Sequence, residues 1–140
     1  MPLSTQEVTP GTVAFLDVSI LTASSELRCS AAPKVLRNGP FLCVQVVEGE
    51  SLWLHVIGSI GKKSLKRLEL QDTWRSGGSG SWQTRAQYIH DERHTLIAPN
   101  SLFVAAAAAE LSFQGERPQV SAEGIKMVLA QLEASSGTTL

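Results

Sequence analysis

Short alternating runs of apolar residues at the start of the chain are typical of β-strands. Residues 12–21 (TVAFLDVSIL) are rich in β-branched and aromatic residues, and their imperfect alternation predicts a strand that begins after Pro10-Gly11. Residues 22–33 contain serines and alanines without a sustained period, and residues 37–40 (RNGP) form a strong turn signal. We therefore expect a long connecting loop after the first strand.

The clearest pattern is a pair of apolar runs on either side of a polar turn. Residues 41–47 (FLCVQVV) and 52–57 (LWLHVI) are separated by residues 48–51 (EGES), which predicts a β-hairpin. Both alternating sets of the first run are mostly apolar, so we expect a central strand that is covered on two faces. In the second run the face that carries His55 is more mixed.

Further short segments follow the hairpin. Residues 65–70 (LKRLEL) fit a strand and a helical turn equally well, and we predict a strand. Residues 75–81 (RSGGSGS) have the composition of a flexible linker and predict a mobile hairpin tip between Trp74 and Trp82. Residues 82–89 and 95–98 are predicted as the next two strands, with a turn at 91–93.

Two segments near the C-terminus favour helices. Residues 102–111 include five consecutive alanines and follow Asn100 and Ser101, which are good helix caps, so we predict a short helix there, with a further strand as the alternative. Ser121 is a good N-cap for a second, amphipathic helix. The apolar positions of that helix follow i, i+3, i+4, i+7 spacing: Ile125, Val128, Leu129 and Leu132.

The order of these elements predicts a mainly β protein with some helix, of the β-rich α+β class. We expect a small antiparallel barrel or a strongly bent sheet with a C-terminal amphipathic helix, and an open α+β sheet with two helices on one side is the alternative. Residues 1–11 are expected to be an N-terminal leader, residues 12–134 a single barrel-like domain, and residues 135–140 a frayed tail.

Length and composition agree with one folded domain. The chain has 140 residues, 43% of them hydrophobic, which is enough for a substantial core. Twelve basic and thirteen acidic residues leave a net charge of −1, so any nucleic-acid site must be a local patch. No apolar run approaches the roughly 18 to 20 residues that span a bilayer, and the polar leader does not resemble a secretion signal. We expect a cytoplasmic protein without a membrane segment.

The cysteines and histidines argue against a metal centre. Cys29 and Cys43 are the only cysteines, too few for a disulfide scaffold or a four-ligand zinc site, and a single bridge between them is left open. We predict that Cys43 is a buried, reduced thiol. His90 and His94 would share a face on a helix, as zinc ligands do, but in an extended segment they stand roughly 13 Å apart. We predict solvated turn histidines, and neither a metal nor a cofactor.

Other catalytic patterns are weak. The sequence has no nucleophile-elbow pattern, and its glycine-rich residues 76–81 lack the following Lys and Ser/Thr of a phosphate-binding loop. A hydrolase that uses a cysteine or a metal is therefore only a third class of function, behind the two developed below.

Positive charge gathers in the middle of the chain. Five cations lie close together, interrupted only by Glu69 and Asp72, and give this stretch a net charge of +3: Lys62, Lys63, Lys66, Arg67 and Arg75. On a barrel rim such a cluster could guide a phosphate backbone, and Trp74 and Trp82 could stack on bases. The competing interpretation is a solvated surface with tryptophans that pack the core or its rim.

The order of motifs resembles the MazF/PemK-like toxin family. The likeness covers most of the chain and rests on Pro10-Gly11-Thr12-Val13, a long loop that ends in Arg37, residues 40–44 (PFLCV) and residues 56–59 (VIGS). Two residues separate Arg37 from Pro40, and Gly58 stands where the family has threonine. The resemblance implies an SH3-like barrel that cuts RNA without a metal.

The same resemblance implies roles for individual residues. Arg37 would stabilise the charged transition state, and Ser59 would position the phosphate or relay a proton. A ribonuclease of this type also needs a base for the 2′-hydroxyl, and His55 would supply it if the loop that carries Arg37 returns to the end of the hairpin.

Two functional hypotheses follow. The first is a non-catalytic binding module whose partner, single-stranded RNA or a protein, meets the Arg37 loop, residues 62–75 and the tryptophan tip. The alternative is a metal-independent MazF-like endoribonuclease, the toxin of a toxin-antitoxin system, that uses Arg37, Ser59 and His55. Because an exposed strand edge invites pairing, we also expect a homodimer.

Overall fold

The computed structural model describes residues 3–29, 38–57, 68–78, 80–89, 95–107 and 117–135. Within these residues seven strands form one antiparallel sheet. The strands are β1 (Val13–Leu16), β2 (Arg28–Cys29), β3 (Gly39–Val47), β4 (Glu50–Ile57), β5 (Leu68–Glu69), β7 (Tyr88–Ile89) and β8 (Thr95–Pro99). A second, two-stranded sheet pairs β6 (Arg75–Ser76) with β9 (Gln119–Val120).

The predicted hairpin is confirmed and forms the centre of the sheet. β3 and β4 are joined by a two-residue turn, because Val47 pairs with Glu50. Glu48 and Gly49 both have positive φ, 50° and 82°, which is the backbone of the tight turns that match strand twist. β1 pairs with the outer edge of β3. The predicted two-sided burial of β3 is also confirmed.

β4 changes partners along its other edge, and this bends the sheet. Residues 50–54 pair with β8, whereas Val56 and Ile57 pair with β7. β2 then continues outward from β8, and β5 from β7. The sheet does not close on itself within the described residues, so the fold is a strongly bent antiparallel sheet with a C-terminal helix. This confirms the predicted fold class.

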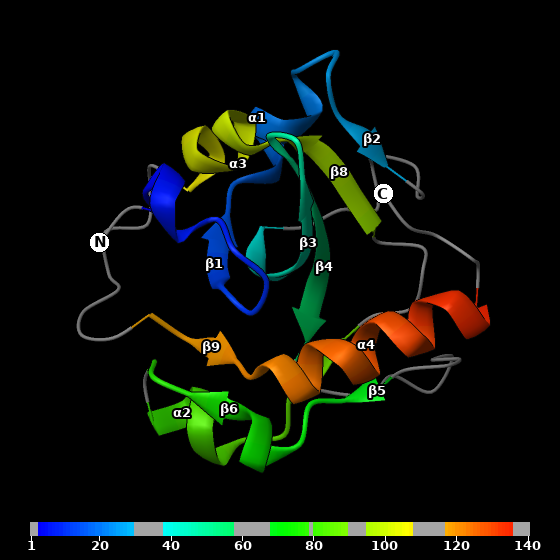
Figure 1. Ribbon diagram of the computed structural model, residues 1–140. Helices are drawn as coiled ribbons and strands as arrows, with labels where there is room; N and C mark the ends of the chain where they lie inside the picture. The colour runs from blue at the N-terminus through cyan, green and yellow to red at the C-terminus, as the bar shows by residue number, and fades with distance from the viewer. Residues whose placement is uncertain are drawn as a thin grey trace.

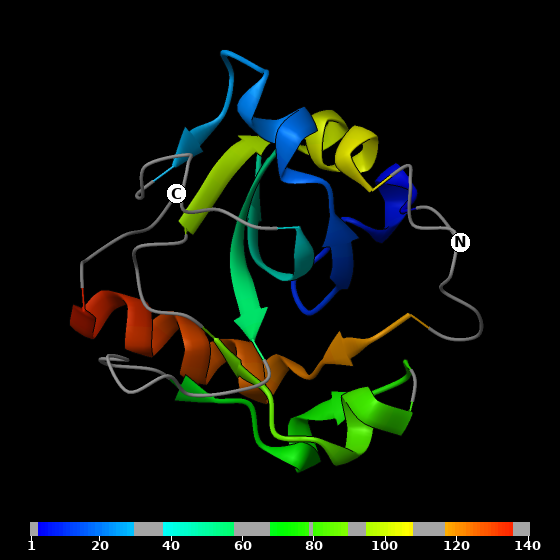
Figure 2. The same ribbon diagram turned by 180° about the vertical axis from the view of Figure 1, so that it is seen from behind.

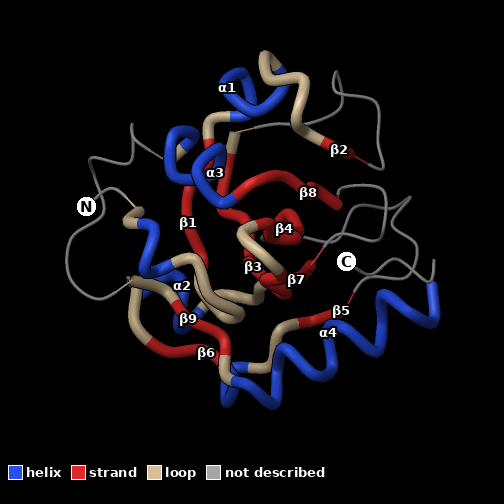
Figure 3. Tube along the Cα trace, turned by 45° about the horizontal axis from the view of Figure 1, so that its top comes forward, coloured by secondary structure: helices blue, strands red, loops and turns tan. Residues whose placement is uncertain are grey.

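Helices and short segments cover both faces of the hairpin (Figure 1). One side carries η1 (Thr5–Glu7), α1 (Val18–Thr22) and α3 (Asn100–Ala106); the other carries η3 (Asp72–Trp74), α2 (Gly80–Thr84), the β6–β9 pair and α4 (Ala122–Ser135). The view from behind shows α4 crossing the lower end of β4 (Figure 2), and the tilted trace shows the strands between the two groups (Figure 3). None of the described helices is long and apolar enough to cross a membrane.

Alternation along the strands divides the interior into two cores. The Trp53 core lies under η1, α1 and α3, and its largest buried side chains are Leu16, Leu21, Phe41, Trp53, Leu96 and Phe103. The Trp82 core lies under α2, α4 and the β6–β9 pair, and its largest buried side chains are Leu42, Leu52, Leu54, Leu70, Trp82, Ile89 and Ile125. Neighbouring residues of β4, such as Trp53 and Leu54, point to different cores, as strand geometry requires.

An ion pair between a buried arginine and a partly exposed glutamate joins the start of the chain to the segment before β9. The side chain of Arg117 is 6% exposed, and its Nε donates to Glu7 Oε2 at 2.8 Å. Burial raises the pKa of Glu7, but the backbone N–H of Ser4 and the Arg117 guanidinium outweigh burial and lower the pKa below its ordinary value of 4.5. Leu3 and Val8, on either side of η1, are buried in the Trp53 core.

The first predicted strand, residues 12–21, is wrong in its second half. β1 ends at Leu16, and Asp17 caps α1 by accepting a hydrogen bond from the Ser19 N–H at 3.0 Å. Asn38 Oδ1 accepts a second one from the Val18 N–H at 2.8 Å. Two side-chain caps therefore start a helix where apolar periodicity indicated a continuing strand. The predicted loop at 22–33 also contains the short strand β2.

The prediction for residues 75–89 is also wrong in part. Residues 75 and 76 form β6 instead of a mobile tip, and Trp82 lies in the helix α2 instead of a strand. Only Tyr88 and Ile89 of the predicted strand pair, as β7. Strands 65–70 and 95–98 appear as β5 at Leu68–Glu69 and as β8, and residues 65–67 lie outside the described residues.

The two C-terminal helices are confirmed where the structure describes them. α3 runs from Asn100 to Ala106, and its N-cap is Pro99, which makes no side-chain cap; the predicted capping role of Asn100 is therefore wrong. Residues 108–111 lie outside the described part. α4 begins after Ser121, whose Oγ accepts from the Gly124 N–H at 3.3 Å. Residues 136–140, most of the predicted frayed tail, are not described.

Candidate functional site

Six of the predicted site residues lie outside the part of the chain that the structure describes: Arg37, Ser59, Lys62, Lys63, Lys66 and Arg67. The segment from His90 to His94 is also outside it. The remaining four predicted residues are described, and they fall in two separate places. Trp74, Arg75 and Trp82 surround the β6–α2 region, and His55 lies on the opposite face of the sheet.

Trp82 is a buried residue of its core and is 6% exposed. Its Nε1 donates to the carbonyl oxygen of Ser76 at 3.1 Å, which ties α2 to β6. Trp74 is half-buried, and a Cβ added to Gly124 would stand 3.0 Å from Trp74 Cβ, so α4 packs closely on it. Trp74 is the last residue of η3 and Trp82 lies in α2, and the buried Trp82 ring is not open to stacking with a base.

Arg75 is held in one orientation by α2. Its Nη1 donates to the carbonyl oxygens of Trp82 at 2.5 Å and Arg85 at 2.6 Å. The guanidinium also lies over the Trp82 ring, 5.8 Å from the ring centre. These carbonyls belong to the C-terminal end of α2, where the helix dipole favours a cation. Arg75 thus stabilises a five-residue helix that is too short to form by its own propensity.

The Nε donor of the Arg75 guanidinium has no acceptor among the residues that the structure describes. Nε is buried and makes no hydrogen bond, and no carboxylate of the described residues pairs with this cation. An unpaired buried donor is costly and uncommon in native structures. The Nε side of the group is the edge that, with Nη2, binds carboxylate or phosphate oxygens in pairs.

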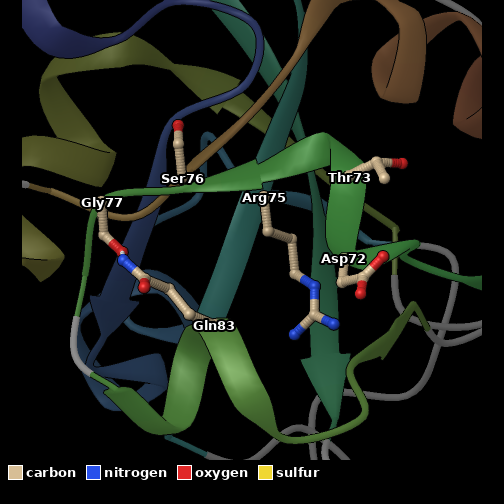
Figure 4. A pocket seen from close by; sticks show the side chains of 6 residues that line it. All are labelled: Asp72, Thr73, Arg75, Ser76, Gly77 and Gln83. Atoms are coloured by element: carbon tan, nitrogen blue, oxygen red, sulfur yellow. Dashed lines mark hydrogen bonds between the residues drawn. The ribbon is translucent and has the colours of Figure 1, made fainter.

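Arg75 also lines an open pocket of about 490 Å³, together with Asp72, Thr73, Ser76, Gly77 and Gln83. Figure 4 shows Arg75 reaching from β6 toward α2, with Asp72 to one side and Gln83 to the other; the Ser76 hydroxyl points away from Arg75. Gln83 Nε2 donates to the Gly77 carbonyl oxygen at 2.8 Å and closes one wall. The residues that line the pocket therefore include one cation and one carboxylate.

Glycine shapes the wall between β6 and α2. Gly78 has a φ of +67°, and a Cβ added to it would stand 2.8 Å from Trp82 Cδ1. Such a contact is too close for any side chain, so the turn that brings α2 back over β6 requires glycine. The Gly/Ser composition that predicted flexibility instead allows a tight turn.

His55 occupies the second place. Its ring stacks on Phe41, with centres 4.7 Å apart, and a Cβ on Gly39 would stand 3.0 Å from His55 Nε2. The described chain next to Arg37 therefore lies close to His55. Along the sequence Arg37 stands four residues before Phe41, and Ser59 stands four residues after His55, the two partners of one register pair.

The cysteines are too far apart for a disulfide. Register pairs place Cys29 beside Leu96, Leu96 beside Trp53, and Trp53 beside Cys43. Three strand spacings, about 14 Å, separate the two cysteines, whereas a bridge needs Cα atoms within roughly 7 Å. Both are free thiols, and burial raises the pKa of Cys43 to about 12. No three metal-ligating side chains gather among the described residues.

Asp72 and Gln83 were not predicted as site residues. Neither belongs to a spacing motif; the only signal in the sequence is that both lie within ten residues of Arg75. The chain matches no protein-family model, and no curated protein matches it.

Proposed function

We propose that this protein is a non-catalytic binding module and that its partner is single-stranded RNA. The observation that carries the proposal is the Arg75 guanidinium, which is held rigidly, lines an open pocket and keeps its Nε donor unpaired among the described residues. A guanidinium fixed before binding loses little conformational entropy when it meets a phosphate.

The sequence around the pocket supports RNA over a protein. Four of the five predicted cations lie in residues 62–67, and β5 leads from them into η3 and the pocket residues Asp72 and Thr73. Phosphates along a flexible strand match several cations spaced along one chain segment. The net charge of −1 limits the attraction to this region.

The test is binding of a fluorescent, mixed-sequence single-stranded RNA, measured by anisotropy, with Arg75→Gln compared against Arg28→Gln. Both variants lose one positive charge, but Arg28 is an exposed residue that pairs with Glu50 on β4. We expect Arg75→Gln to weaken binding by about tenfold and Arg28→Gln by less than about twofold, because only Arg75 would contact phosphate.

Circular dichroism of both variants must show that each remains folded. Equal losses in the two variants would mean that the RNA responds to net charge alone and would reject the pocket. If the wild-type protein does not bind RNA at low salt, the proposal fails, and a protein partner becomes the hypothesis to test.

A second candidate function is the MazF-like endoribonuclease. It is favoured by the position of Gly39 against His55 and by the equal spacing of Arg37 and Ser59 from the Phe41–His55 pair. We expect RNA cleavage that persists in chelator and is lost in Arg37→Ala, read on a sequencing gel. If the protein does not cleave RNA even at high protein concentration, the endoribonuclease hypothesis is rejected and only the binding module remains.

The expected SH3-like barrel, cytoplasmic location and homodimer belong to this proposal. The exposed apolar side chain of Phe15, 48% accessible on the edge strand β1, supports self-association. Sedimentation equilibrium of wild-type protein and Phe15→Ser would measure it. If the wild-type protein is monomeric at high micromolar concentration, the proposal of a homodimer is rejected.

A further inference from the structure

We infer that the Nε/Nη2 edge of Arg75 is a binding site for a phosphodiester and that it binds two oxygens of one backbone phosphate. This inference rests on the proposed function, since it names the group of the RNA that the pocket recognises. It goes further by assigning the ligand to one edge of one side chain. It also gives Asp72 a role in selecting the charge of the ligand.

Arg75 has a buried donor without an acceptor among the described residues. Two carbonyl oxygens occupy Nη1, at 2.5 and 2.6 Å, and leave Nε buried without an acceptor. Nε is not accessible to water in the structure, so its missing hydrogen bond lowers the stability of the folded protein. An oxyanion that accepts from Nε and Nη2 together supplies the missing acceptor in the side-on geometry that guanidinium groups favour.

The Trp82 ring supports the Arg75 guanidinium. Arg75 lies over the Trp82 ring, and Trp82 is itself anchored through Nε1 to the Ser76 carbonyl oxygen. The guanidinium is therefore already held in place before the ligand binds. A flexible surface arginine would pay that entropy on binding.

Exposed polar side chains form the walls of the pocket beside Arg75. Gln83 and Asp72 are exposed side chains on either side of Arg75, and Gln83 is held by a single bond to the Gly77 carbonyl oxygen. Because Nε is buried, an oxyanion reaches it only after a neighbouring group moves. The Asp72 carboxylate repels negative charge, and it opposes a phosphate dianion more than a singly charged phosphodiester.

The experiment follows the Arg75 Nε–H resonance in nitrogen-proton spectra of the whole protein. The probes are dimethyl phosphate, a monoanionic diester, and inorganic phosphate. We expect the diester to shift the Arg75 Nε–H and Trp82 indole resonances in a saturable way. The Trp53 indole, which donates to Ser51 Oγ at 2.8 Å in the other core, is the internal reference and should not move.

The matched variants are Asp72→Asn and Glu26→Gln. Both remove one negative charge from an exposed side chain, but Glu26 is far from the pocket in the chain segment between α1 and β2. We expect Asp72→Asn to tighten binding of inorganic phosphate at pH 8 by about two- to fivefold and binding of the diester by less. Glu26→Gln should change neither. Equal effects of the two variants, or of Asp72→Asn on the two probes, would overturn the role of Asp72.

The outcomes separate this inference from the proposed function. If RNA binds but the Arg75 Nε–H does not respond to either anion, the phosphodiester site is rejected while the binding module stands. If the anions bind at Arg75 but RNA does not bind, the site stands and its ligand is a different phosphodiester. A uniform shift of surface resonances that does not saturate would mean nonspecific ionic screening and would reject the site.

Discussion

The two cores of this protein are built in different ways. The Trp53 core closes between regular strands and two helices, and its centre is the stack of Trp53 on Phe103, with ring centres 5.1 Å apart. The Trp82 core is closed partly by two-residue strands, a five-residue helix and a 3-10 turn. Side-chain bonds to backbone carbonyls hold these pieces together.

This difference separates scaffold from candidate site. A core closed by apolar packing has few unpaired polar groups and little to offer a ligand. Among the described residues two buried polar atoms lack a hydrogen bond: Asn100 Oδ1 at the start of α3, and Arg75 Nε on β6. Of these two, Arg75 Nε is a cationic donor and belongs to a residue that lines the pocket. The face that is less regular is therefore the face that can recognise a partner, as loops on a rigid scaffold often do.

The largest expected effect is in the Trp53 core. Trp53→Ala should lower the free energy of unfolding by about 3 to 5 kcal/mol, because the side chain is fully buried and stacked on Phe103. Guanidinium unfolding followed by circular dichroism measures the change. If the variant does not fold, Phe103→Leu should cost about 1 to 2 kcal/mol. A loss below about 1 kcal/mol for Trp53→Ala would show that this core is not the scaffold.

The next effect separates steric fit from backbone strain in the Trp82 core. Gly78→Ala should cost about 2 to 3 kcal/mol, since the residue has positive φ and its new Cβ would meet Trp82 and Pro118. Gly49→Ala is the control, because it has a φ of +82° and nothing within 4 Å of the new Cβ. It should cost only about 1 kcal/mol. Equal urea midpoints for the two variants would contradict the close packing around Gly78.

A smaller effect is expected from Arg75→Lys. Lysine keeps the charge but cannot hold two carbonyl oxygens with one rigid group, so the variant should lose about 1 to 2 kcal/mol. The loss should appear first as faster hydrogen exchange of amides in α2, with α3 amides unchanged except through global unfolding. Faster exchange in both helices to the same degree would mean that the two cores unfold as one unit.

The smallest effect concerns the ion pair that links the two regions. Glu7→Gln should lower stability at pH 7 by about 1 kcal/mol or less, because Glu7 is more than one-third exposed. The folded pKa of Glu7 is lowered, so its contribution is present above its unfolded pKa and is lost as pH falls through the folded value. The urea midpoints of wild type and variant should therefore converge below about pH 4.5. Midpoints that differ more at pH 3 than at pH 7 would reverse this assignment.

The elements that were predicted correctly have local signals in their own sequence. The β3–β4 hairpin has alternating apolar residues and a Glu48-Gly49 turn, and α4 has a serine N-cap and helical spacing of its apolar residues. Such signals act between neighbours in the chain, so they can be recognised without knowing the tertiary structure.

The elements that were missed depend on distant partners. β6 exists because Arg75 pairs with Val120, and α2 is held by the Arg75 guanidinium instead of its own propensity. Residues 82–89 looked like a strand because apolar side chains recur there, but Trp82 is buried from a helix. No local rule distinguishes these cases.

The candidate site was only partly predictable for the same reason. The charge pattern predicts Arg75 as a site residue, and the base that a ribonuclease of the toxin family needs predicts His55. Placement of Asp72 and Gln83 around the guanidinium depends on the turn at Gly78 and on the packing of Trp82. Neither the turn at Gly78 nor the packing of Trp82 can be recognised from the spacing of residues in the sequence.

The two-residue turn between β3 and β4 also indicates the order in which the chain folds. Closing this hairpin brings together residues that are neighbours in sequence, so it costs little chain entropy and can form within microseconds. The pairing of Arg75 with Val120 closes a much longer loop and needs the hairpin as a surface on which to dock. We expect the hairpin to form the folding nucleus and the pocket to be completed last, so that slowing the final step would delay ligand binding without delaying collapse.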